Sequence, residues 1–507
     1  MHVDHADFGR TGELVAVELD VTARGAVVAD ERNGFGNVDS PTGVELQENG
    51  APRRGDGKQT LRHFDSTNGL GIQEHGELAE HPTGQSGKWG AVFNFVNTIV
   101  GAGIIGLPFA LYQCGLWSGL LLIALAAFLV DRSAIMLVEA GQRTNRMNYE
   151  EMMGLMFGAA GVHSFCFFAF VMAFGAMSAY LIIIGDTIPE IASAAGHDGF
   201  FTDRHAVIAL FSIFIILPIA SLKDMHKLAY TSFLSVSADA ILILIVLATG
   251  PEESKSNDDI DRAETLVFIR PTVFAGFGAI SFAFVCQSSS FLVYRSLKRP
   301  GLDAWVSITN TSLAIAWGMA TVLAMIGFLS FVDQTEGDIL NNFSTTHAAA
   351  NAARGFLAVT MVFTFPMEMF VARHVLDASI FRTLLRMGPI TNGRHYAITL
   401  GIWAMSNVVA LSTDNLGAVL ELFGAFAASA IGYVMPAVLY MRVRREDLRR
   451  GTSAWRKDSP NYVPGLGGRL WALRDFYTPA FMALFGVVAM VAGVATALVD
   501  ELSYTKA

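Results

Sequence analysis

From residue 89 onward, long apolar segments alternate with short polar ones. Each apolar segment has about 20 residues, the length that an α-helix needs to cross the hydrocarbon core of a bilayer. We number these spans one to eleven in chain order: 89–111, 115–138, 162–185, 205–222, 229–249, 271–294, 305–331, 354–376, 395–411, 415–441 and 478–499. The pattern predicts an all-α, polytopic integral membrane protein with eleven transmembrane helices in a lipid bilayer.

Residues 1–88 have a different character. They are polar and show no sustained apolar periodicity, which is typical of segments that stay disordered. No basic stretch followed by an apolar run stands at the start, so we expect no cleaved signal peptide. The expected organisation is a disordered tail at 1–88, a transmembrane domain at 89–499 and a short C-terminal segment at 500–507.

Composition supports the membrane assignment. Hydrophobic residues make up 52% of the chain and charged residues only 16%, whereas a soluble globular chain carries about 25% charged residues. Cys114, Cys166 and Cys286 all lie in apolar segments, where cysteine acts as a small buried side chain. The sequence contains no GxxxxGK, HExxH or nucleophile-elbow motif, so we expect no enzyme activity, no organic cofactor and no nucleic-acid partner.

Lysine and arginine residues gather on alternate polar segments. They are enriched after spans two, four, six, eight and ten, most of all in residues 442–475, whereas residues 250–270 are rich in Asp and Glu. Basic loops face the cytoplasm, which predicts a cytoplasmic N-terminus. With eleven spans, the C-terminus then lies on the outer or lumenal side of a plasma membrane or of a vacuolar or lysosomal membrane.

Spans one and six both contain residues that disfavour a helix. Span one includes Gly101, Gly103, Gly106 and Pro108, and span six includes Gly276 and Gly278 followed by a polar stretch. Unwound backbone is tolerated at membrane depth only where it lines a cavity. Interrupted spans at matching places in two halves of a chain indicate the binding site of a secondary transporter.

Four stretches resemble one known family. Residues Phe93–Leu111, Gly278–Pro300, Phe363–Leu376 and Leu416–Tyr440 are similar to the corresponding helices of the amino acid/auxin permease family of the APC superfamily. This family includes sodium-coupled neutral amino acid transporters and vacuolar amino acid transporters. The resemblance covers roughly residues 87–500. It implies a LeuT-type fold with two inverted five-helix repeats, 89–249 and 271–441, and an additional helix at 478–499.

The resemblance also implies secondary active transport of an α-amino acid, expected to be neutral, by alternating access. Many relatives carry His or Asn after the equivalent of Cys286, whereas this chain has Gln287-Ser288-Ser289-Ser290, so selectivity for the side chain stays open. We expect backbone N–H groups at Gly101, Ala102 and Gly103 to bind the substrate carboxylate and carbonyls around Ser281 and Phe282 to bind its amine. Asn97 and Gln287 complete the candidate substrate-binding set.

Two coupling ions remain possible. The resemblance places a sodium site between spans one and eight, at Asn97, Thr360 and Thr364. The rival ion is a proton, because carboxylates inside membrane spans are costly and usually functional; the candidates are Asp239 and Glu421. Glu368 is expected instead to pair with the nearby Arg373.

A second class of function uses the same features. An amino-acid-sensing receptor would bind the same ligand and signal through the N-terminal tail with little net transport. Sequence alone does not separate this receptor from a transporter, and it names neither the amino acid nor the protein partners.

Overall fold

The computed structural model describes residues 86–197, 199–222, 231–256, 267–450 and 476–504. The chain divides into two units, 1–64 and 65–507, and all described residues belong to the second. The predicted tail therefore lies outside the described residues, except for its last three positions. Within the described part, all regular elements are helical, and the one extended pairing is an isolated bridge between Ser86 and Leu297.

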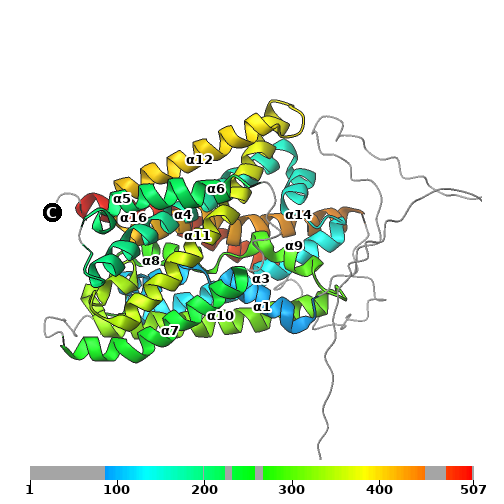
Figure 1. Ribbon diagram of the computed structural model, residues 1–507. Coiled ribbons are helices and arrows are strands. Elements are labelled where there is room, and N and C mark those ends of the chain that lie inside the picture. Colours follow the sequence, from blue (N-terminus) through cyan, green and yellow to red (C-terminus); the bar gives the residue numbers. More distant parts are fainter. Residues whose placement is uncertain (1–85, 198, 223–230, 257–266, 451–475, 505–507) are drawn as a thin grey trace, which may run out of the picture. The chain divides into compact units, whose positions relative to one another are not determined.

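Helices occupy all eleven ranges that the apolar pattern predicts. In chain order they are α1 (Lys88–Ile99), η1 (Ala102–Gly106) and α2 (Leu107–Cys114); α3 (Leu116–Thr144); α4 (Tyr149–Ala194); α5 (Arg204–Phe211), η3 (Ser212–Ile216) and α6 (Leu217–Ala220); α7 (Thr231–Ser256); α8 (Val273–Phe284) and α9 (Gln287–Arg295); α10 (Leu302–Phe331); α11 (Ala348–Leu376); α12 (Asn392–Ser412); α13 (Leu416–Phe423), η9 (Gly424–Ala428), η10 (Ala430–Val434) and α14 (Met435–Arg450); and α16 (Thr478–Tyr504). Figure 1 shows the long helices lying side by side.

Apolarity and length single out most of these helices as membrane-spanning. Among the described residues, seven helices qualify, and the bent pair formed by α1 and α2 raises the number to eight. The segment Arg204–Ala220 is apolar but shorter, and α7 and α12 occupy the two remaining predicted ranges. The class of protein is thus confirmed, while the count of eleven stays a prediction.

The helices pack in two groups. Spans one, two, six and seven contact one another through the pairs α1·α10, α2·α8, α3·α8 and α3·α10. Spans three, four, eight and nine contact one another through α4·α11, α4·α12, α4·α5 and α5·α12. The helix contacts recur when each span number is shifted by five. Span one packs on span seven (α1·α10) as span six packs on span two (α8·α3). Span five packs on span seven (α7·α10) as span ten packs on span two (α14·α3).

Candidate functional site

The first span is interrupted where the sequence places its glycines. Helix α1 ends at Ile99, Val100 is extended (φ −85°, ψ 100°), and Gly101 is more so (φ −141°, ψ −159°) before the 3₁₀ segment η1 begins at Ala102. The helices on either side of the break are bent by 55°. Because the first N–H groups of a helix have no acceptor within it, η1 presents unpaired donors directly after the break.

The sixth span is interrupted as well, but later than its glycines suggest. Helix α8 continues to Phe284, Val285 is extended (φ −67°, ψ 117°), and α9 begins at Gln287. The last four carbonyls of a helix have no intrahelical donor, and in α8 these belong to Ser281, Phe282, Ala283 and Phe284. The break thus leaves the carbonyls of this helix end without an intrahelical donor, and Ser281 itself is helical.

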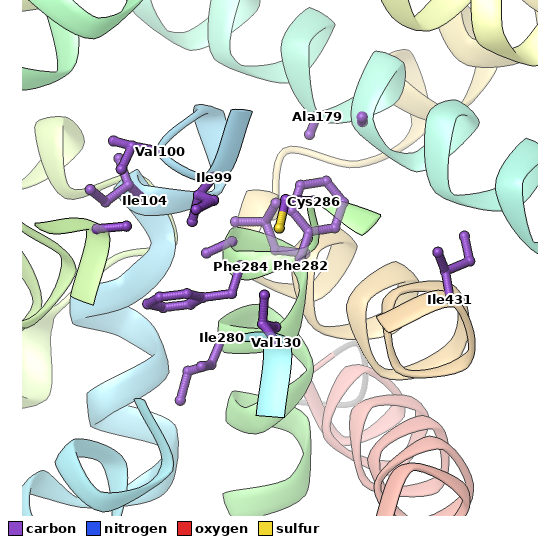
Figure 2. Close-up of a cluster of buried hydrophobic side chains, with 14 of the residues drawn as sticks. Ile99, Val100, Ile104, Val130, Ala179, Ile280, Phe282, Phe284, Cys286 and Ile431 are labelled. Carbon is purple, nitrogen blue, oxygen red and sulfur yellow. The ribbon is translucent and has the colours of Figure 1, made fainter. Parts of the chain in front are cut away.

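Apolar side chains of both broken helices meet around these breaks. Figure 2 shows Ile99, Val100 and Ile104 of the first span beside Ile280, Phe282 and Phe284 of the sixth. These side chains are buried, so their packing holds the two unwound segments next to each other. The packing of these side chains therefore stabilises the unwound backbone of both spans.

A cavity of about 430 Å³ lies against both breaks. We call it the central cavity. Its walls come from the first and sixth spans and from α4 and α11, and they include Gly101, Gly103, Phe282, Ser288, Tyr180 and Glu368. Among the described residues that line it, Glu368 alone has an acidic or basic side chain. Pockets of this size hold single small molecules.

The predicted substrate residues divide into two sets. Gly101, Gly103 and Phe282 line the central cavity, and Ala102 lies between the two glycines in η1. Ser281 is 1% exposed, and its hydroxyl donates to the Phe277 carbonyl and accepts from the Tyr433 hydroxyl. The side chain of Ser281 is thus used inside the protein, and only its carbonyl remains for a ligand.

Gln287 does not line the cavity either. It is fully buried; its Nε2 donates to Ser133 Oγ at 2.7 Å and its Oε1 accepts from the Cys286 N–H at 3.0 Å. The side chain therefore satisfies the backbone at the break and fastens it to α3. The cavity is instead lined by the next two residues, Ser288 and Ser289, because successive residues of α9 point in different directions.

The oxygen atoms of the candidate sodium ligands differ in their hydrogen bonding. Asn97 Oδ1 is buried and has no hydrogen-bond donor among the described residues. The hydroxyl of Thr360 donates to the Leu357 carbonyl at 2.7 Å, and that of Thr364 donates to the Thr360 carbonyl at 2.7 Å. A hydroxyl that donates in this way keeps lone pairs for a cation. None of the three lines the central cavity, so this sodium site remains a prediction.

The buried carboxylates occupy different places. Asp239 in α7 and Glu421 in α13 are each 2% exposed, and Glu421 lines a second cavity, described below. The expected pair between Glu368 and Arg373 is wrong. The Arg373 guanidinium donates to the Ala220 carbonyl and to Thr399 Oγ1 and lies over the Phe370 ring, so Glu368 is left facing the central cavity.

The second cavity is larger, about 1010 Å³, and rich in carboxylates. We call it the acidic cavity; its charged lining residues are Asp186, Glu190, Arg204, Arg270, Asp333, Glu336, Asp338, Asp414 and Glu421. Arg204 bridges helices here, because it pairs with Asp186 at 2.7 Å and donates to the carbonyls of Ala410 and Thr413. The fully buried Arg354 pairs with Glu190 and donates to the carbonyls of Leu340 and Phe343.

Asp338 is the most deeply buried carboxylate of the loop between α10 and α11. Its side chain is 2% exposed, and its Oδ1 accepts from the Leu340 N–H at 2.9 Å. Burial raises the pKa of Asp338 to about 7, with the negative charges of Asp186 and Glu190 adding to the effect. This loop therefore contains a group that titrates near neutral pH.

Close backbone packing separates the two cavities. A Cβ on Gly103, in the wall of the central cavity, would lie 2.7 Å from Ala283 Cα, and a Cβ on Gly278 would lie 2.3 Å from the Glu421 carbonyl oxygen. Such distances admit only glycine. Spans one and six are thus pressed against each other and against α13 on the side of the acidic cavity, and the two cavities do not form one passage.

Comparison with known proteins adds a family and a fold. Residues 84–464 match the family model described as transmembrane amino acid transporter protein. The chain is 33% identical over 384 residues to a putative sodium-coupled neutral amino acid transporter 11 of Danio rerio, covering 74% of this chain and 84% of that protein. It is 30% identical over 387 residues to vacuolar amino acid transporter 2 of Saccharomyces cerevisiae, covering 74% of this chain and 79% of that protein.

Solved structures resemble the fold at low sequence identity. The inward-facing conformation of Mhp1 superposes with a TM-score of 0.52 at 11% identity, covering 83% of this chain and 92% of that chain. A closed conformation of Mhp1, a nucleobase-cation-symport-1 family transporter, superposes with a TM-score of 0.50 at 15% identity. At these identities the similarity concerns the arrangement of the helices.

Proposed function

The chain belongs to the transmembrane amino acid transporter protein family, and from this premise we propose that it is a secondary active transporter that moves neutral α-amino acids by alternating access. The observation that carries the proposal is the pair of interrupted helices, α1–η1 and α8–α9, whose breaks share the wall of one cavity. Unwound backbone at this depth is costly unless it binds something.

The two breaks offer complementary groups for an amino acid. The N–H groups of Gly101, Ala102 and Gly103 stand at the start of η1, where an anion such as a carboxylate is favoured. The carbonyls at the end of α8, from Ser281 and Phe282 onward, favour the ammonium group. Backbone recognition of both groups leaves α4 and α11, on the remaining wall of the cavity, to contact the side chain of the substrate.

Alternating access would come from motion between the two groups of helices. The recurrence of helix contacts five spans apart supports two repeats at 89–249 and 271–441, a further helix at 478–499 and a LeuT-type arrangement of eleven spans. In the proposed topology the N-terminal tail is disordered and cytoplasmic, and the C-terminus is outer or lumenal. The close packing at Gly103 and Gly278 would be the seam that opens toward the acidic cavity.

The coupling ion is sodium or a proton. Asn97 Oδ1, buried without a donor, supports a cation near the first break, with Thr360 and Thr364 as further oxygen ligands. Asp239 and Glu421, both buried carboxylates, support a proton. The membrane would be the plasma membrane for a sodium-driven protein, whereas an acidic vacuole or lysosome would supply protons.

Purified protein in liposomes tests the proposal. We expect labelled neutral amino acids to accumulate under an inward sodium gradient or an inward proton gradient, each imposed separately. Sodium dependence that disappears in Asn97→Ala would assign the sodium site. Specific binding without accumulation under either gradient would contradict transport and would favour an amino-acid-sensing receptor that signals through the tail.

A further inference from the structure

Glu368 has an unusual setting for a carboxylate. It belongs to α11, lines the central cavity, and forms no ion pair or hydrogen bond with any of the described residues. Its neighbours in the wall are apolar or uncharged, among them Met367, Phe370 and Val371. The carboxylate therefore faces the space where a substrate held at the two breaks would extend its side chain.

One other ionisable group, Tyr180, lies near Glu368. Tyr180, in α4, also lines the central cavity, and its hydroxyl lies within electrostatic range of both Glu368 and the buried Asp239 of α7. None of the other acidic or basic side chains on α11, and none of those in the following pairs on the elements packed against it, contacts Glu368: Arg373 bonds Ala220 and Thr399, His163 bonds Ser379, His374 pairs with Glu150, His395 bonds Ser221, Asp377 pairs with Arg382 and Arg394, Arg204 with Asp186, and Arg354 with Glu190. No cation of the described residues neutralises Glu368.

A carboxylate in this place needs a positive partner. An isolated charge in a mostly apolar cavity is strongly disfavoured once the cavity closes, and it is relieved either by protonation or by a cation in contact with it. A neutral side chain of a substrate provides no cation, so a proton must occupy Glu368 while such a substrate is enclosed. A lysine or arginine side chain provides the cation itself and leaves no need for the proton.

We propose that Glu368 distinguishes substrates by the charge of their side chains. Neutral amino acids are carried together with a proton on Glu368, and amino acids with a cationic side chain are carried without that proton. In both cases the enclosed cavity has the same net charge. The proton enters Glu368 from the solvent on the side where the cavity is open, and it returns to solvent on the other side. This inference rests on the proposed transport function and extends its substrates to basic amino acids.

Uptake of labelled leucine and labelled lysine into proteoliposomes tests the inference, with a pH-sensitive dye inside to follow protons. For the wild-type protein, leucine uptake should acidify the lumen and rise with an inward proton gradient. Lysine uptake should leave the internal pH unchanged and should fall at acidic external pH, because protons compete for Glu368. Glu368→Gln should lower lysine uptake at least tenfold and abolish the acidification that accompanies leucine.

Three further variants sharpen the result. Glu368→Asp keeps the carboxylate and should keep the preference for lysine over the Gln variant even where its rate is lower. Glu150→Gln removes a carboxylate that lies outside the central cavity and pairs with His374, and it should retain the leucine-linked acidification. Asp239→Asn removes the rival carboxylate; if it abolishes acidification while Glu368→Gln does not, the assignment to Glu368 is overturned.

The inference and the proposed function fail in different ways. Lysine uptake and proton movement that are the same in Glu368→Gln as in the wild type would contradict the inference and leave amino acid transport standing. Absence of uptake of any amino acid by folded wild-type protein would contradict the transport function itself. Thermal stabilisation by lysine in detergent gives a reading that does not depend on transport, and we expect it for the wild type and Glu368→Asp but not for Glu368→Gln.

Discussion

At the scale of single residues, two glycines that look alike in the sequence have different tasks. Gly101 lines the central cavity and has open space where a Cβ would stand, and its φ of −141° is available to any residue. Gly103 is in contact with the backbone of Ala283, which a Cβ would meet at 2.7 Å. Gly101 thus leaves room for a ligand, whereas Gly103 is required for the packing of one broken helix on the other.

Substitutions at Gly101 should act through the cavity. Gly101→Leu places a large side chain in the binding space, so we expect uptake to be lost while the protein still folds and reaches the membrane. Gly101→Ala is the matched control and should retain measurable uptake, because its Cβ meets no atom within 4 Å. Radiolabel uptake with surface or vesicle quantification measures both; unchanged uptake in the leucine variant would refute the assignment of the site.

Gln287 should matter for stability and not for substrate affinity. Gln287→Met keeps the volume but removes the acceptor of the Cys286 N–H and the donor to Ser133. A buried group left without its partner costs about 1–3 kcal/mol. We expect a lower midpoint of thermal unfolding in detergent with an unchanged KM for the substrate. A large rise in KM at unchanged stability would return Gln287 to the binding site.

At the scale of elements, the loop between α10 and α11 is held by buried polar groups. Arg354 of α11 donates to the carbonyls of Leu340 and Phe343 and pairs with Glu190 of α4. The loop also packs against the tenth span, since a Cβ on Gly337 would lie 2.4 Å from the Gly417 nitrogen. Because Asp338 is buried in the same loop, the packing of this loop should depend on pH.

The sign of this dependence follows from the pKa of Asp338, which is about 7 in the folded loop against an ordinary value of 3.8. The packed loop binds a proton that the open loop releases, so its stability is greatest at acidic pH and decreases as pH rises toward 7. For one proton, the ratio of packed to open loop falls about tenfold per pH unit between about 4 and 7. Above pH 7 it should change no further.

Cysteine labelling measures this opening. Thr335→Cys places a thiol at a position that is 4% exposed, and we expect its reaction with a membrane-impermeant maleimide to accelerate from pH 5 to pH 7 beyond the effect of thiol ionisation. Asp338→Asn in the same background retains the acceptor for the Leu340 N–H and should remove the additional acceleration. Equal pH profiles with and without Asp338 would contradict the prediction.

At the scale of the whole molecule, the lysine and arginine content of the loops predicts which side of the membrane each helix end faces. Residue Thr345 precedes α11 and Gly388 follows it, and both positions are exposed. If α11 crosses the membrane, these positions lie on opposite faces. The positive-inside rule then assigns Gly388 to the cytoplasm and Thr345 to the outer or lumenal side.

Labelling of Thr345→Cys and Gly388→Cys from one side tests this topology. The three native cysteines are free and buried, so background reaction should be low. In sealed vesicles of known orientation, we expect an impermeant maleimide to reach the thiol at 345 from the outer or lumenal face and the thiol at 388 only from the cytoplasmic face. Labelling of both from the same face would contradict the span assignment.

Much of the fold was predictable because membrane insertion is a local property. Each apolar run of about 20 residues must become a helix to satisfy its own backbone in lipid, and helices occur at all eleven predicted ranges in the described structure. The break in span one was also predictable, since Gly101 and Gly103 disfavour a helix. The later break in span six was not, because neither Val285 nor Cys286 disrupts a helix as glycine does; there Val285 is extended and the Cys286 N–H donates to the Gln287 side chain.

The site shows the same division. The sequence alone determined a helical membrane protein with two interrupted helices and a small set of carboxylates inside apolar spans, because those features follow from residue type and spacing. Only the tertiary structure decided which of these residues share a cavity: it turned Gln287 and the Ser281 hydroxyl inward, directed Arg373 away, and left Glu368 facing the breaks. Orientation around a helix axis depends on the neighbouring helices, and no local pattern specifies them.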